Sequence, residues 1–172
     1  MTEKNNVVNG FCFMPPSLGA WMRSTIPKND FEGEIPWTPL KRPISEMVFS
    51  LMTSAGINIT TDPAFDMERE KKEPMWGDPS YRRIPISATV ADIDVNHLHV
   101  NTDYIKQDIN VVLPINRFQE FATDGIIGAL APTAYSYYGY QMDPKVLLEE
   151  TMPKVLADMK TEGVEAVLLT PT

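Results

Sequence analysis

The chain has 172 residues, of which 43% are hydrophobic, and its formal net charge is −8 at pH 7. This length supports one compact core, and the acidic balance excludes a surface for nucleic acid or anionic lipid, since both require clustered Lys and Arg. A single cysteine, Cys12, excludes an internal disulfide. Without a long apolar stretch or a leader-like pattern, the sequence predicts a soluble cytoplasmic protein that makes no membrane contact.

Residues 1–45 are predicted to form an irregular, proline-rich N-terminal arm, because proline interrupts helices and removes backbone donors. A short helix is expected within this arm, near Leu18–Ser24. The run Glu46–Gly56 is almost continuously apolar and predicts a strand that is buried on both faces. We therefore expect an α/β domain over residues 46–172, with no internal repeat.

The segment Asp62–Gly77 carries charges of both signs and is predicted to be a solvated loop. Short strands are expected at Tyr81–Pro85 and Ser87–Ile93. His97 and His99, the two histidines of the chain, come next. If they lie on a strand, their spacing of two residues places both side chains on one face.

The block Asp108–Leu113 leads into the next predicted helix. Asn116 is expected to cap this helix, with Gln119 as its partner in a capping box and Gly125 beyond the last turn. Its buried face is expected to contain Phe118, Phe121 and Ala122.

A strand and an aromatic loop are expected after this helix. Ile126–Ala131 predicts a buried strand, and Tyr135–Tyr140 predicts the loop that follows it. The tyrosines of this loop have two interpretations: they line a pocket for a small amine or carboxylate, or they pack over the edge of the sheet.

The last helix is the most clearly predicted element. Asp143 and Pro144 mark its start, and Pro153 should kink it or restart it. One apolar face is expected to contain Leu148, Met152, Val155 and Met159. The final segment, Gly163–Thr172, begins with a glycine suited to the left-handed position after a helix and continues as a buried strand. These elements predict a three-layer, Rossmann-like α/β fold with a mostly parallel sheet, which is incomplete within this chain.

Two groups of residues are candidates for chemistry. The first contains His97, His99, Asp103 and Asp108. Imidazole and carboxylate groups serve as metal ligands and as acids or bases, but a packed histidine and a solvated one beside loop aspartates fit the sequence as well. The second group, Thr170 and Thr172, follows the last strand, where ligands gather in open α/β sheets. The absence of G-x-G-x-x-G, P-loop and G-x-S-x-G motifs leads us to predict no cofactor-binding or metal site in the chain.

Several segments, taken in their order and spacing, carry a resemblance to a known family. They are Trp37–Pro39, Val48–Gly56, Asp78–Pro85, His97–Asp103, Asp108–Pro114 and Gly163–Thr170. Together they resemble the selenoprotein B family of glycine, sarcosine, betaine and D-proline reductases, from about Trp37 to the last residue. The histidine block and the tyrosine-rich loop look closer to less characterised relatives, which leaves the substrate open.

The resemblance implies a component of a reductase that cleaves a C–N bond with electrons from a dithiol. In that family a selenocysteine or cysteine follows the strand corresponding to Val164–Leu169, so a selenocysteine is expected directly after Thr172. Its selenol attacks the carbon that bears the amine, and a pyruvoyl group on a partner subunit activates that amine. The implied partners are other reductase subunits in a homo- or hetero-oligomer, a thioredoxin-like or other dithiol donor, and a small amine or amino-acid substrate.

The nucleophile is absent from the 172 residues, so the chain alone is expected to be inactive. Supporting roles as proton donors or orienting groups are assigned to both candidate groups, which comprise His97, His99, Asp103, Asp108, Thr170 and Thr172. The alternatives are a non-catalytic binding or assembly subunit that docks through the proline-rich arm, and an inactive truncation product.

Overall fold

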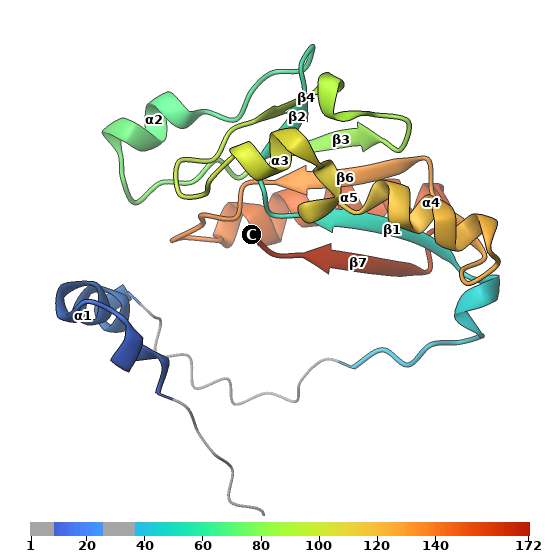
Figure 1. Cartoon of the computed structure of the whole chain (residues 1–172), viewed down its shortest axis with the longest axis horizontal. Coiled ribbons are helices and arrows are strands. Elements are labelled where there is room, and N and C mark those ends of the chain that lie inside the picture. The colour runs from blue at the N-terminus through green and yellow to red at the C-terminus, as the bar shows by residue number, and fades with distance from the viewer. Residues whose placement is uncertain (1–8, 26–36) are drawn as a thin grey trace, which may run out of the picture. The chain divides into compact units, whose positions relative to one another are not determined.

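The computed structural model describes residues 9–25 and 37–172. The chain divides into two compact units, Met1–Pro39 and Leu40–Thr172, and the strands found in the described residues belong to the second unit (Figure 1). In the described part of the chain, no helix has both the length and the apolar character needed to cross a membrane.

The first unit contains the helix predicted within the proline-rich arm. A 3-10 turn, η1 (Gly10–Phe13), precedes α1 (Pro16–Thr25), which confirms that prediction. Asn9 stabilises the turn, since its side chain accepts a hydrogen bond from the backbone N–H of Phe11. The other residues of the predicted arm that precede Trp37, 1–8 and 26–36, lie outside the described residues.

The main sheet has five strands and is mostly parallel, as predicted. Its centre is β1 (Val48–Thr53), which pairs in parallel with β7 (Ala166–Thr170) along one edge. Along its other edge β1 pairs in parallel first with β5 (Ala129–Leu130) and then with β6 (Thr133–Tyr137). The strand β3 (Tyr81–Pro85), predicted at these residues, runs antiparallel to β6. Because β6 and β7 are both parallel to β1, the carboxyl ends of these three strands lie together at one end of the sheet, which is called its carboxyl edge below.

Helices cover both faces of this sheet and give three layers (Figure 1). On one face, α3 (Asp103–Gln107) and α4 (Ile115–Thr123) pack against side chains such as Leu51. On the other face, α5 (Met152–Thr161) packs against Met52. Leu51 and Met52 are neighbours on β1 and therefore point to opposite faces. The prediction that β1 is buried on both faces is confirmed.

A second, two-stranded sheet lies beside the first. It pairs β2 (Ile57–Ile59) with β4 (Ile93–Val95) in antiparallel register. The sequence predicted no strand at β2, and it predicted one strand where η3 (Val90–Asp92) turns into β4. Positive φ at Gly56, +63°, allows the chain to turn between β1 and β2.

The predicted solvated loop over 62–77 is wrong, because this segment contains the helix α2 (Met67–Lys72). The side chain of Asp66 caps the helix by accepting a hydrogen bond from the backbone N–H of Arg69. Charges of both signs cover its exposed faces, but Glu70 is buried. The mixed charge therefore marks an amphipathic helix whose inward face includes a carboxylate.

Two further predictions in the second half of the chain are wrong in detail. Tyr135 lies within β6 and not in a loop, because both faces of that strand are buried and its alternation is hidden. Of the strand expected over Ile126–Ala131, only β5 forms. The helix α4 starts at Ile115 with Pro114 as its N-cap, so Asn116 lies in its first turn and exchanges hydrogen bonds with Asn110.

The last helix restarts near Pro153, as predicted. A π-helical segment, η5 (Leu147–Thr151), leads into α5 at Met152. The wider turn rotates Leu148 out of the apolar stripe, so that 60% of Leu148 is exposed while Val155 and Met159 are buried. Gly163 has φ of +73° after α5, which confirms its predicted left-handed conformation. Burial along β7 alternates, with Val167 and Leu169 exposed, and this strand is therefore not fully buried as predicted.

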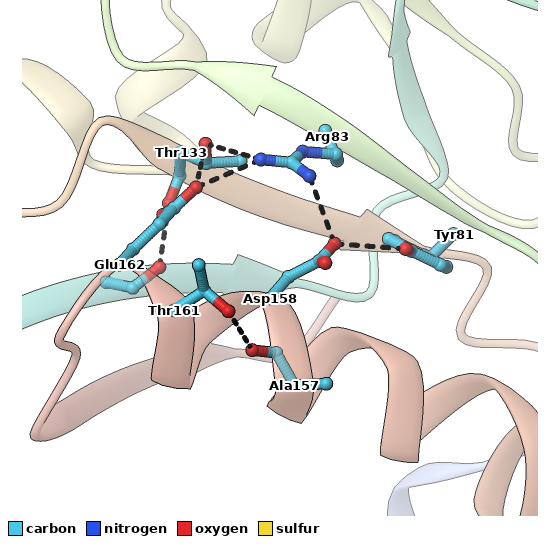
Figure 2. A network of polar contacts seen from close by, with 8 residues as sticks. Tyr81, Arg83, Thr133, Ala157, Asp158, Thr161 and Glu162 are labelled. Carbon is cyan, nitrogen blue, oxygen red and sulfur yellow. Dashed lines mark hydrogen bonds and ion pairs between the residues drawn. The ribbon is translucent and has the colours of Figure 1, made fainter.

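An ion-pair network fixes α5 on β3 and β6 (Figure 2). The guanidinium of Arg83 pairs with Asp158 at 3.2 Å and with Glu162 at 3.0 Å. Asp158 also accepts a hydrogen bond from the hydroxyl of Tyr81, and Glu162 accepts one from Thr133. Because Glu162 is largely buried, its carboxylate depends on these partners for the polar contacts that water would otherwise supply.

Replacing Arg83 with Met is expected to lower the free energy of unfolding by about 1 kcal/mol, because two carboxylates lose a shared partner. The control is Arg117→Met, since the ion pair between Arg117 and Glu120 is exposed on both sides. Its loss should cost about 0.3 kcal/mol. Urea unfolding of the two variants measures the difference, and equal stabilities would contradict a structural role for the network.

Candidate functional site

The candidate site begins at the edge where three parallel strands end. In the register of the sheet, Thr53 of β1 faces Ser136 of β6 on one side and Thr170 of β7 on the other. Ser54 then joins the three strand ends: its hydroxyl accepts a hydrogen bond from the backbone N–H of Thr172, at 2.9 Å. The carbonyl of Ser54 accepts another from the backbone N–H of Gly139, also at 2.9 Å. This edge is where open α/β sheets place their ligands.

A histidine pair reaches this edge from the loop after β4. The sequence analysis considered these two histidines on a strand, but they lie in a loop that turns at His99. The ring centroids of His97 and His99 are 5.9 Å apart. The backbone N–H of His99 donates to Nδ1 of His97 at 3.2 Å. The His97 ring lies 4.7 Å from the ring of Tyr138, the residue directly after β6. The turn therefore brings both imidazoles beside the carboxyl end of β6.

The protonation state of His97 follows from these contacts. Burial lowers the pKa of His97, and the neighbouring His99 lowers it further, against a smaller opposing effect of Glu70. A neutral imidazole that accepts a hydrogen bond at Nδ1 carries its proton on Nε2. His97 is thus a neutral ring with its Nε2–H available as a donor.

The buried carboxylate beside these histidines belongs to Glu70 of α2. Glu70 is only 3% exposed, and its Oε1 lies 2.7 Å from Nε2 of His99. Its Oε2 and the hydroxyl of Tyr138 are both buried, and neither has a hydrogen-bond partner within the described residues. Burial, and then the Glu70 carboxylate, raise the pKa of the Tyr138 hydroxyl. Tyr138 therefore remains a neutral donor next to a carboxylate.

The tyrosines after β6 divide between packing and the site. Tyr135 and Tyr138 are fully buried, which fits the packing interpretation of the aromatic segment. The ring of Tyr140 stacks against His99 with centroids 4.4 Å apart, and its hydroxyl donates to the carbonyl of Pro74. This stack makes one wall of the environment of His99.

Comparison with known proteins shows the family to which the chain belongs. Residues 23–172 match the model of a family described as glycine/sarcosine/betaine reductase selenoprotein B. The chain belongs to this selenoprotein B family. A similar curated protein, the D-proline reductase subunit gamma of Acetoanaerobium sticklandii, is 37% identical over 134 residues, which are 78% of this chain and 52% of that protein. The chain thus spans about half the length of this relative. No solved structure matches the chain.

The other predicted site residues of this chain lie apart from the histidine pair. Asp108 accepts hydrogen bonds from the backbone and side chain of Asn110, and these lower the pKa of its carboxyl group. Asp103 is exposed in the first turn of α3. Within residues 9–25 and 37–172, no hydrogen bond or ion pair joins either aspartate to His97 or His99. A catalytic role for the aspartates stays a prediction.

The two threonines of the second candidate group differ in their surroundings. The hydroxyl of Thr170 bonds to the carbonyl of Val112, which ties β7 to the segment before α4. Thr172 is exposed, and its backbone N–H donates to the hydroxyl of Ser54. In the described part of the chain no group of three or more His, Cys, Asp or Glu residues is arranged to hold a metal ion.

Sequence reasoning missed Glu70, which completes the environment of the histidines, whereas Tyr138 belongs to the aromatic segment Tyr135–Tyr140 that one interpretation placed at a pocket. A signal for Glu70 was present, because Asp66 as an N-cap and Pro74 beyond the last turn delimit a short helix. On that helix Met67 and Glu70 are three residues apart and share a face. No pattern in the sequence indicated that this face packs toward His99, because the contact spans 29 residues.

The low pKa of His97 makes stability depend on pH. In the unfolded chain His97 has the ordinary value of about 6.5, so below this pH the unfolded state binds more protons than the folded state. The contribution of His97 to the free energy of unfolding is therefore fully present above about pH 6.5 and is lost as the pH falls toward the lower, folded value. In the variant His97→Phe, the free energy of unfolding, measured with urea, should decline less between pH 7.5 and pH 5 than it does in the wild-type protein. Parallel declines in both proteins would contradict the burial of a neutral imidazole.

Proposed function

We propose that the chain is a component of a selenol- or thiol-dependent reductase that cleaves a C–N bond in a substrate of the glycine, sarcosine, betaine or D-proline type. The observation that carries this proposal is the family match over residues 23–172, combined with the site at the carboxyl ends of β1, β6 and β7. The similar protein from A. sticklandii, a D-proline reductase subunit, supports the same class of reaction.

The nucleophile of this reaction is a selenocysteine or cysteine directly after Thr172. The bond between the Thr172 backbone and Ser54 supports this placement, because it directs the chain toward the edge where Tyr138 and His97 lie. A selenolate or thiolate forms a bond to carbon as the C–N bond breaks, and the electron pair of that bond leaves on nitrogen. A dithiol then supplies the two electrons that release the carbon product, and it becomes a disulfide.

The leaving nitrogen needs a proton, and the site contains groups that can supply one. His99 beside Glu70 is the best-placed donor, and the neutral His97 can orient the amine through a hydrogen bond from its Nε2–H. Thr170 and Thr172 hold the last strand beside β1, and Asp103 and Asp108 have orienting roles further away. A pyruvoyl group carried by a partner subunit would activate the amine, and no residue of this chain is assigned to hold that group.

The first experiment is an intact-mass measurement of the product of the native gene, expressed with selenium supplied. A longer, selenium-containing product is expected. Combined with its partner subunits and a dithiol, this product should release the amine from one of the four substrates. The control is the 172-residue chain in the same mixture, which should be inactive. A native product that ends at Thr172 would overturn the selenol mechanism and leave a binding or assembly role.

A further inference from the structure

Glu70 is a carboxylate in an environment that disfavours charge. It is 3% exposed, and one of its two oxygens is buried without a hydrogen-bond partner. A buried carboxylate is costly unless other groups compensate it, and truncation of its partner is more costly still. The groups that compensate it in this structure are Nε2 of His99, at 2.7 Å, and the neighbouring hydroxyl of Tyr138. Because burying this carboxylate costs free energy, we expect Glu70 to have a role other than packing.

Several anchors fix the position of Glu70 on its short helix. The backbone N–H of Asp66, at the start of α2, donates to the side chain of Asp78 at 2.9 Å. The guanidinium of Arg82 donates to the carbonyls of Pro63 and Ala64 just before the helix. These bonds join α2 to β3, so Glu70 is presented to His99 by a braced segment.

The contacts of His99 leave one ring nitrogen, Nδ1, free to exchange a proton with a ligand. Nε2 is engaged by Glu70, one face of the ring lies against Tyr140, and yet 48% of the His99 side chain is exposed. Within the described residues no hydrogen bond is made to Nδ1 of His99. His97 differs, because the backbone N–H of His99 occupies its Nδ1. Of the two histidines, His99 is therefore the one with a free Nδ1.

We propose that Glu70 is a positioning residue that holds His99 with its proton on Nε2, so that Nδ1 of His99 exchanges a proton with an amine ligand at the carboxyl edge of the sheet. In the protonated state of the ring, the proton on Nδ1 moves to the amine nitrogen as that nitrogen receives the electron pair of the C–N bond. His99 then returns to the neutral form with Nε2–H still donated to Glu70. A carboxylate that accepts a hydrogen bond from one ring nitrogen fixes the tautomer and the orientation of an imidazole.

The positioning part of this proposal concerns the chain alone, whereas the transfer to an amine rests on the proposed function. The first test is therefore nitrogen NMR of the imidazole rings in the 172-residue protein, which needs no activity. The neutral ring of His99 should carry its proton on Nε2, and Glu70→Gln should reduce the preference for this tautomer about tenfold, because a charge-assisted hydrogen bond becomes a neutral one. Unchanged His99 signals in Glu70→Gln would overturn the proposal.

A matched control lies on the same segment. Glu73 follows α2, is more than half exposed, and pairs with Arg69. Glu73→Gln removes the same charge from the same region and should leave the His99 tautomer unchanged. If both variants change the His99 tautomer equally, a general loss of charge explains the effect, and Glu70 has no specific positioning role.

The second test measures turnover in the assembled reductase. Glu70→Gln should lower kcat about 10–100-fold while KM changes little, because the variant impairs proton transfer and not substrate binding. Glu73→Gln should have the wild-type kcat. A variant with an altered His99 tautomer but a normal kcat would overturn the role in proton transfer. If the wild-type protein has no reductase activity, the proposed function fails while the NMR result still decides whether Glu70 positions His99.

Discussion

Replacing His99 with Phe is expected to lower the free energy of unfolding by about 2–3 kcal/mol. Phe keeps the stack against Tyr140 but removes the nitrogen that faces Glu70. The loss therefore reports the cost of a buried carboxylate without its partner. Urea unfolding at neutral pH measures it.

A double-mutant cycle separates this cost from simple loss of packing. In the Glu70→Gln background the same His99→Phe change should cost at least 1 kcal/mol less, because no buried charge remains to be left alone. Additive losses in the two single variants would show that the contact contributes no coupling. The cycle is independent of whether the protein catalyses a reaction.

Replacing Gly77 with Ala is expected to destabilise the protein by about 3 kcal/mol. A Cβ at this position would lie 1.7 Å from the carbonyl oxygen of Tyr140, so one of two backbone segments must move. Because the ring of Tyr140 stacks on His99, the NMR signals of His99 should shift as well. The matched control is Gly10→Ala, where a Cβ meets nothing within 4 Å and stability should be unchanged. Wild-type stability of the Gly77 variant would show that this close approach relaxes easily.

The α/β class and several elements were predictable because they depend on local patterns. The apolar run around β1, the positive φ of Gly163 and the restart of the last helix at Pro153 follow from residue type alone. The strand β6 was missed because its residues are buried on both faces and many are tyrosine or serine. Leu148 was misplaced because the helical period changes within η5.

The candidate site was predictable only in part. His97 and His99 stood out as the two histidines of the chain, and the ends of parallel strands indicated where ligands would gather. Glu70 could not be placed beside them, since a run of charges on a short helix predicts solvent contact on every face. The contact depends on how α2 packs against the segment after β4, 29 residues further along the chain, and this packing has no local signature.

The π-helical segment Leu147–Thr151 has a consequence for how such a chain can change. A turn of this kind is what one inserted residue makes of an α-helix. Removing one residue, such as Glu149, would return this segment to the ordinary α-helical period, and because the π-turn already absorbs that residue, the segments on its two sides would keep nearly the same phase. Gln141, whose amide reaches the carbonyls of both Asp78 and Tyr138, would therefore keep its contacts. The chain can thus lose a single codon here while the wall beside the histidines stays in place.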